Sequence, residues 1–130
     1  MTGKYEDLLD LDDELNASLW KFKRIIAIDV LRGLIIETPR DTGRAQSNWV
    51  VGIDSPDGKI YANRSSQANS ITRGVAILPK KINDASRLVY ISNNLPYIRR
   101  LNDGYSEQKP KFFVEGVMRK AGLQIKDGDI

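Results

Sequence analysis

Residues 8–37 constrain the fold of this chain more than any other stretch. Their apolar residues recur at every third or fourth position, which is the spacing of one face of an α-helix: Leu8, Leu11, Leu15, Leu19, Phe22, Ile26, Val30 and Gly33. Thr38 precedes Pro39, and a residue before proline is disfavoured in the α region, so the helix should end there. Such a helix is roughly 45 Å long at 1.5 Å per residue. We therefore predict that part of it projects beyond the core.

The two halves of this predicted helix differ in character. We expect it to begin within residues 5–10, with Asp7 or Asp10 as the N-cap. The first half carries a narrow apolar stripe, whereas residues 25–36 are apolar on nearly every side, and such a helix is buried on several sides. Burial between subunits and coverage by the chain's own sheet both remain open. The candidate interface or core residues are Trp20, Phe22, Ile28, Leu31 and Ile35.

The start of this helix is acidic, while the rest of the chain is basic. Residues 6–14 hold six acids and no base: Glu6, Asp7, Asp10, Asp12, Asp13 and Glu14. The remaining residues carry 20 bases against 11 acids, a net charge of +9. Two interpretations stay open. The acids form an arm steered toward a basic partner, such as another copy of the chain, or they favour the helix dipole.

Composition narrows the class of protein. The chain has 130 residues, enough for one domain with a modest core. It has no cysteine and no histidine, which excludes disulfides and thiolate metal sites and removes the commonest general base. The first residues turn acidic at once and no apolar run approaches a membrane span. We expect a soluble intracellular protein that is not an enzyme and uses no cofactor, metal or membrane.

The middle of the chain predicts a turn and two strands. Residues 39–43 form a turn, and residues 47–53 alternate as a half-buried strand with Trp49, Val51 and Ile53 on one face. Residues 55–58 are a strong turn signal, so residues 59–62 are predicted to return as the second strand of a hairpin.

The remaining elements are shorter. Residues 66–78 predict a helix capped by Ser65 or Ser66 and weakened by Gly74. A strand over 88–92, a helical turn over 96–103 and a closing helix over 112–121 follow, with Gly122 as the C′ residue. The fold class is α+β: a long N-terminal helix packed on a small antiparallel or mixed sheet, with a second helix and a short C-terminal helix. Residues 1–130 form one domain, with 1–7 and 123–130 expected to be flexible.

Charged clusters suggest two candidate sites, a metal site and a nucleic-acid-binding surface. Asp12, Asp13 and Glu14 are a candidate metal site, but neighbouring helical positions point in different directions and do not converge on one ion. Basic residues gather around residues 21–24, 40–44, 80–87 and 99–100, and Trp20 and Phe22 interleave with the first group. The alternative function is therefore a small basic nucleic-acid-binding module.

Two segments carry a resemblance to a known family. Residues 38–49 read TPRDTGRAQSNW, and residues 93–104 read NNLPYIRRLNDG, followed by Pro110. With the long helix before them, they resemble the tail-completion and neck proteins of tailed bacteriophages, the family grouped with the minor tail protein Z of phage lambda. The resemblance covers roughly residues 15–122, which is most of the chain. Residues 63–81 are longer and more helical than in the shortest members, and we expect an insertion there that contacts a phage-specific partner.

The resemblance assigns structural roles to ten motif residues: Pro39, Asp41, Thr42, Gly43, Trp49, Asn93, Pro96, Tyr97, Gly104 and Pro110. Asp41 is expected to bind backbone N–H groups of its turn, Gly43 to adopt positive φ, and Trp49 to anchor the first strand. The family implies a ring, often of six or twelve copies, in the virion neck, assembled in the host bacterial cytoplasm. It implies contact with an adaptor or portal-proximal connector protein and a tail-terminator or tail-tube protein, while DNA passes the lumen without specific binding.

Overall fold

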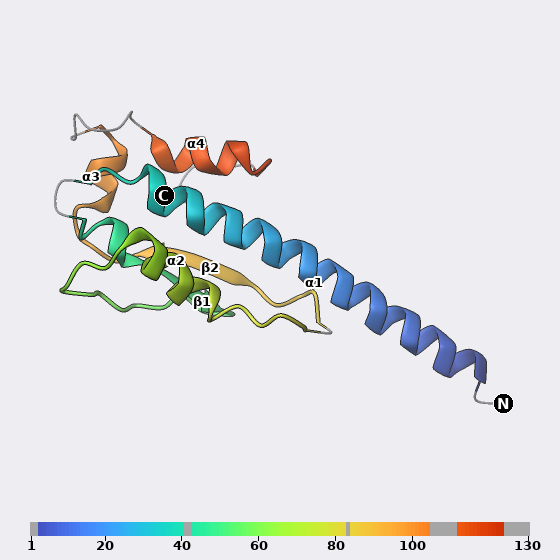
Figure 1. Ribbon diagram of the computed structural model, residues 1–130. Helices are drawn as coiled ribbons and strands as arrows, with labels where there is room; N and C mark the ends of the chain where they lie inside the picture. The colour runs from blue at the N-terminus through green and yellow to red at the C-terminus, as the bar shows by residue number, and fades with distance from the viewer. Residues whose placement is uncertain (1–2, 41–42, 83, 105–111, 124–130) are drawn as a thin grey trace.

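The fold is an α+β arrangement around one long helix. The computed structural model describes residues 3–40, 43–82, 84–104 and 112–123, with only the backbone for residues 3–10. Its elements are α1 (Gly3–Glu37), a 3₁₀ turn η1 (Gln46–Asn48), β1 (Trp49–Ile53), α2 (Gln67–Val75), β2 (Val89–Asn93), α3 (Ile98–Asn102) and α4 (Phe113–Lys120). Figure 1 shows α4 on one side of α1, and the sheet with α2 on the other. The predicted fold class is confirmed.

Helix α1 is continuous over 35 residues and ends at Glu37, just before the predicted stop. It begins at Gly3, so the prediction that Asp7 or Asp10 caps it is wrong, because both residues lie inside the helix. Nothing in residues 4–13 breaks a helix, and acids in the first turns favour the helix dipole. The first part of α1 projects well beyond the rest of the molecule (Figure 1).

The sheet has two antiparallel strands, β1 and β2, with Trp49 opposite Asn93 and Ile53 opposite Val89. The predicted hairpin between residues 47–53 and 59–62 is wrong, because residues 59–62 run as an irregular loop. The backbone N–H and C=O of Tyr61 both bind the Asn48 side chain, which removes them from any strand pairing. Both faces of β1 are covered, since Trp49, Val50 and Val51 are all buried.

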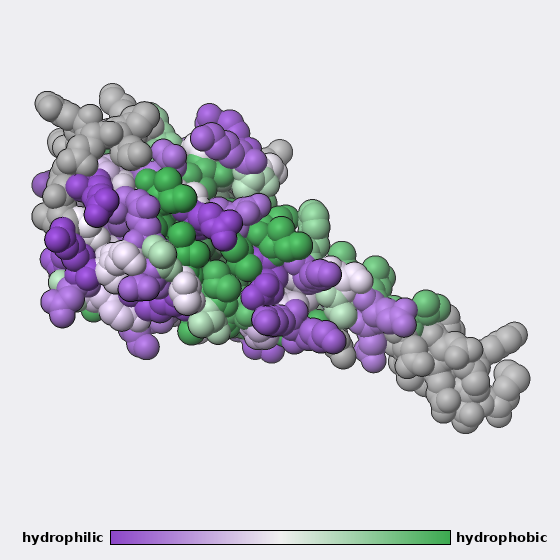
Figure 2. Space-filling view, in the orientation of Figure 1, coloured by the Kyte–Doolittle hydropathy of each residue, from purple (hydrophilic) through white to green (hydrophobic). Residues whose placement is uncertain are grey.

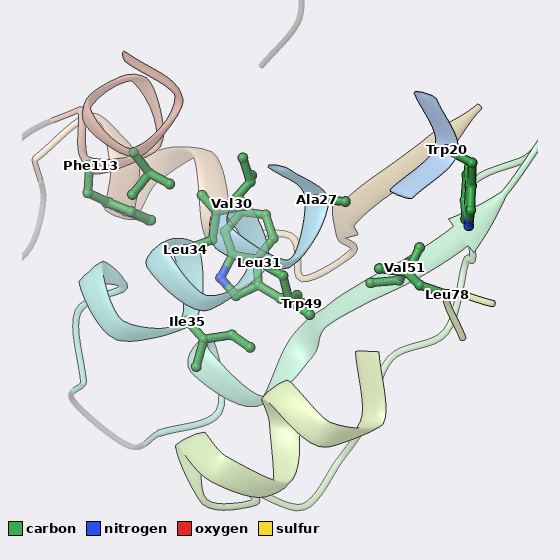
Figure 3. Close-up of a cluster of buried hydrophobic side chains, with 11 residues drawn as sticks. Trp20, Ala27, Val30, Leu31, Leu34, Ile35, Trp49, Val51, Leu78 and Phe113 are labelled. Atoms are coloured by element: carbon green, nitrogen blue, oxygen red, sulfur yellow. The ribbon is translucent and has the colours of Figure 1, made fainter. Parts of the chain in front are cut away.

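The core lies where α1 crosses the sheet, α2 and α4 (Figure 3). Its buried apolar members are Trp20, Ala27, Val30, Leu31, Leu34, Ile35, Trp49, Val51, Leu78, Phe113 and Val117. Helix α2 approaches α1 closely at Gly74, where an added Cβ would lie 2.4 Å from Leu31 Cδ2. The glycine that weakens α2 locally is therefore the residue that allows the two helices to pack.

Shorter elements follow their local signals. The Ser66 hydroxyl caps α2 by accepting a hydrogen bond from the Asn69 backbone N–H at 3.0 Å. The helix ends at Val75, three residues earlier than predicted, and turns lead on to Pro79. Gly43, Gly104 and Gly122 all have positive φ, which fits the turn and helix-end roles expected of them.

Candidate functional site

The first motif forms a buried polar turn that fixes the end of α1. The Trp49 Nε1–H donates to Thr38 Oγ1 at 2.8 Å, and this hydroxyl in turn donates to the Leu34 carbonyl. Gln46 Nε2 donates to the Thr38 carbonyl at 3.0 Å. Thr38, Gln46 and Trp49 are all buried, so these bonds satisfy groups that water does not reach. The turn therefore locks the last turn of α1 to η1 and β1.

The same turn holds the loop that follows β1. Asn48 Nδ2 donates to the Arg44 carbonyl at 2.8 Å and to the Tyr61 carbonyl at 3.0 Å. Ser47 Oγ accepts from the Ser65 N–H at 2.8 Å. The Arg73 guanidinium lies 3.9 Å from the centre of the Tyr61 ring and donates to the Ser47 carbonyl. The irregular segment between β1 and α2 is thus tied to the turn at two points.

The second motif also binds backbone groups. Asn93 Nδ2 donates to the Ala45 carbonyl at 2.9 Å, which joins the end of β2 to the polar turn. Asn94 Nδ2 donates to the Asp57 and Lys59 carbonyls at 2.8 and 3.0 Å. Pro96 and Tyr97 lead directly into α3. Asp41, Thr42 and Pro110 lie outside the described residues.

Asn102 is a structural residue that the sequence pattern missed. It is buried at the end of α3, and its Nδ2 donates to the Glu115 carboxylate at 3.0 and 3.1 Å. Its Oδ1 accepts from the Val114 N–H at 3.0 Å. These bonds attach α4 to α3. In the sequence, Asn102 stands beside Asp103 and Gly104, so it reads as an ordinary turn residue and gives no signal of its buried role.

The described residues hold no arrangement suited to catalysis by metal. Asp12, Asp13 and Glu14 are exposed on α1, and no group of three His, Cys, Asp or Glu side chains in the described ranges is placed to hold an ion. The polar side chains of the turn bind backbone carbonyls and N–H groups of the protein itself. Among the described helices, none has both the length and the apolar character needed to cross a membrane.

An exposed apolar stripe runs along the projecting part of α1. We define the arm as residues 3–19. The arm stripe consists of five exposed apolar side chains that begin in the arm and continue into the next two turns of α1, with these exposed fractions: Leu11 60%, Leu15 59%, Leu19 48%, Phe22 65% and Ile25 51%. At 3.6 residues per turn they occupy roughly a third of the helix circumference. Figure 2 shows hydrophobic residues along one edge of the projecting helix. Contiguous exposed apolar surface of this kind marks an interaction site.

The candidate interface or core residues divide between two faces of α1. Trp20, Leu31 and Ile35 are fully buried, and the Trp20 Nε1–H donates to the Pro79 carbonyl at 2.8 Å. Ile28 is half-buried and packs against the core. Phe22 is exposed, so of its two predicted roles the core is excluded and the interface stays a prediction, because the core lies on the opposite side of the helix with Trp20. Phe22 therefore belongs to the open face.

An apolar groove lies beside the second half of α1. Its volume is about 610 Å³, and α1, β2, α3 and α4 form most of its walls. Its apolar lining comprises Ile26, Ala27, Val30, Leu34, Trp49, Val89, Ile91, Ile98, Val114, Met118 and Leu123, and its charged lining residues are Lys23 and Arg99. Such a lining offers shape and apolar contact, with few groups that could take part in chemistry.

Comparisons of the chain with family models, with curated proteins and with solved structures found no match. The resemblance to phage neck proteins therefore remains a prediction based on the two motifs. The molecule itself contributes three features to a functional argument. These are the buried polar turn, the arm stripe and the apolar groove.

Proposed function

We propose that this protein is a structural component of the head–tail connector of a tailed bacteriophage. In this proposal it forms an oligomeric ring that joins the capsid connector to the tail and allows the genome to pass. Its partners are further copies of itself, an adaptor or portal-proximal protein on one side and a tail-terminator or tail-tube protein on the other. It acts in the virion neck and carries out no chemical step.

The observation that carries the proposal is the arm stripe on a helix that projects from its own domain. Large exposed apolar side chains are unfavourable in water, and burial stabilises by about 25 cal/mol per Å² of apolar surface. A projecting helix brings its apolar face within reach of a neighbour. Stable interfaces bury about 1,200–2,000 Å² in total, and repeated contact between copies closes into rings when the rotation allows it.

The two motifs support the same proposal through their structural roles. Gln46, Asn48 and Asn93 use their side chains to bind backbone groups of other segments. These bonds set the angle between α1 and the sheet. A ring subunit needs that angle to be rigid, because the direction of the arm determines where the next copy sits.

Purified full-length protein tests the proposal by native mass spectrometry and electron microscopy, followed by localisation in virions that carry a tagged copy. We expect particles of one discrete copy number and a tag confined to the neck. A tag absent from the neck of assembled virions rejects the proposal, and so does incorporation only in the capsid shell or the tail fibre.

The alternative, a small basic nucleic-acid-binding module, predicts DNA binding that weakens steeply with salt. Several bases are engaged within the chain: Lys23 Nζ donates to the Ala85 carbonyl at 3.3 Å, and Arg24 Nε donates to the Leu78 carbonyl at 3.2 Å. Lys21, Lys80 and Lys81 are exposed. A gel shift at low and moderate salt separates the two functions. Absence of binding at low salt removes the alternative.

A further inference from the structure

We infer that the arm stripe of one copy docks in the apolar groove of the next copy. This inference deepens the proposed function and rests on it, since it names the two surfaces that meet in the ring. Each copy contributes its arm to one neighbour and its groove to the other. Such a head-to-tail contact uses two different surfaces and repeats around a ring.

The two surfaces cannot meet within one molecule. The stripe includes Leu15 on α1, and Val30 of the same uninterrupted helix lines the groove. These two residues stand roughly 22 Å apart along the axis at 1.5 Å per residue. A continuous helix does not fold back on itself, so the groove can receive an arm stripe only from a second copy.

The stripe has the spacing that helix-binding grooves select. Leu11, Leu15, Leu19 and Phe22 follow at intervals of four, four and three residues, the pattern of an amphipathic helix laid in a hydrophobic groove. Apolar side chains of α1, β2, α3 and α4 line the groove, together with Trp49 of β1. A groove of this kind accommodates the side chains of one helical face.

Charge favours the same pairing. Between Leu11 and Leu19 the helix carries the exposed acids Asp12, Asp13 and Glu14 and no base. Helices α3 and α4 carry four bases, Arg99, Arg100, Arg119 and Lys120, and a single acid, Glu115. Glu115 is held by Asn102. Of these bases Arg99 lines the groove, and the other charged lining residue is Lys23. An acidic arm that enters a groove whose charged lining residues are both bases is electrostatically complementary, which favours correct encounter and register.

The face of α1 that carries the arm stripe already packs against a helix farther along the chain. At Gly33 an added Cβ would lie 2.8 Å from Val117 Cγ1, so α4 packs closely there. Gly33 continues the periodic series of Leu11, Leu15, Leu19 and Phe22 along α1. Helix α4 thus covers the far end of this series, and the described residues leave its beginning open. The neighbour supplies the missing cover.

Cysteine cross-linking tests the inference directly, because the chain has no cysteine of its own. Two full-length variants, Leu15→Cys in the arm and Met118→Cys in the groove, are tagged to differ in size, mixed and mildly oxidised. We expect a disulfide between the two variants, and a ladder of multimers from the chain that carries both changes. The matched control replaces Met118→Cys with Ala76→Cys, which is exposed on the opposite side of α1, and should give little product.

The outcomes separate the inference from the proposed function. Cross-linking of Leu15→Cys with itself, at least as strong as in the mixture, shows that two arms pair with each other and overturns the inference. Discrete rings or neck incorporation without the arm-to-groove disulfide also overturn it, but leave the proposed function standing. Absence of both cross-linking and neck incorporation rejects the two together.

A polar substitution in the arm provides a second measurement. Leu15→Asp should weaken self-association about 30-fold, as expected for a central interface residue, while Asp13→Glu, which keeps the acidic charge on the same helix, should change it little. The circular dichroism and melting temperature of Leu15→Asp should match those of the original chain, because Leu15 lies outside the core. Unchanged association of Leu15→Asp contradicts the inference.

Discussion

The two halves of α1 have similar apolar spacing but opposite surroundings. In residues 20–37 the side chains of Trp20, Leu31 and Ile35 are fully buried against the sheet, α2 and α4. In the described part of the arm, Leu11, Leu15 and Leu19 are exposed. Hydrophobic periodicity thus identifies a helical face without saying what covers it. The first half has an apolar face that its own domain does not reach.

The helix also has two apolar faces where one was expected. The series through Leu11, Leu15 and Phe22 lies on one side, and the core residues Trp20, Ala27 and Leu31 lie on the other. In residues 20–37 both faces are apolar, which explains why this half looks hydrophobic all round. Helix α4 covers the far end of the first face at Gly33, whereas Leu11, Leu15 and Phe22 are exposed. The exposed part of the first face is therefore available for assembly.

Truncation of one leucine in each half gives the sharpest test of this contrast. Leu31→Ala should lower the free energy of unfolding by about 3 kcal/mol, because it leaves a cavity in the core. Leu15→Ala should change it by no more than about 0.5 kcal/mol in dilute protein, since its side chain is already in water. Urea denaturation at low concentration measures both. Equal losses would show that the arm is part of the folded core.

Thr38→Val tests how firmly the polar turn holds the end of α1. The valine keeps the shape but leaves the buried Trp49 N–H without an acceptor, so we expect a loss of about 2 kcal/mol. The matched control, Thr72→Val, lies on the exposed side of α2 and should have little effect. Denaturation curves compare the two variants. A neutral Thr38→Val would mean that the turn does not stabilise the junction of α1 and β1.

Gly74→Ala tests the close packing of α2 on the buried face of α1. The new methyl would meet Leu31, which is fully buried and cannot move aside freely. Strain from such overpacking exceeds the gain in helix propensity, and we expect a net loss of about 1 kcal/mol. Gly116→Ala in α4 is the control: nothing lies within 4 Å of its Cβ position. It should stabilise by about 0.5 kcal/mol. Thermal melts should show shifts of opposite sign.

The smallest expected effect is on the pKa of Asp84, in the loop beside the boundary between the two halves of α1. Lys23 of α1 contacts this loop, since its Nζ donates to the Ala85 carbonyl. The hydrogen bond from the Ser86 hydroxyl to the Asp84 carboxylate is the main cause that holds the pKa of Asp84 below its usual value. The hydrogen bond from the Ser86 N–H comes second, and the charges of Arg87 and Lys23 contribute. Because the folded pKa is depressed, this contribution to stability is present above the unfolded pKa of 3.8 and is lost as the pH falls through the folded value.

Ser86→Ala should therefore raise the pKa of Asp84 toward its ordinary value. Titration of the carboxyl by nuclear magnetic resonance measures it, with Asp57, which lies in another loop, as an internal reference. The effect on stability should be slight, because Asp84 is exposed to solvent. An unchanged pKa would show that the hydrogen bond from the Ser86 hydroxyl does not form in solution.

Much of the local structure follows from neighbouring residues. The stop of α1 before Pro39, the Ser66 cap and the positive φ of Gly122 all depend on groups within a few positions in the chain. A strand around Trp49 and the short helices near residues 98 and 113 were also predicted, although the strand was expected to be half-buried and both of its faces are covered. These features are set by backbone sterics and by hydrogen bonds that close over short distances.

The candidate site was only partly predictable. The two motifs marked Thr38, Trp49 and Asn93, but their hydrogen-bond partners lie in other segments. Asn102 gave no signal, since burial of an asparagine depends on what packs above it. The groove was not predicted at all, because four elements from separate parts of the chain form most of its walls.

The sequence alone determined one long helix, two strands, their approximate limits and an acidic start to a basic chain. Tertiary structure decided that β1 pairs with β2 and not with residues 59–62, and that Trp20 rather than Phe22 faces the core. The physical reason is the range of the forces. Periodicity and capping act between near neighbours, whereas strand pairing and the choice of helix face depend on which distant surfaces exclude water together.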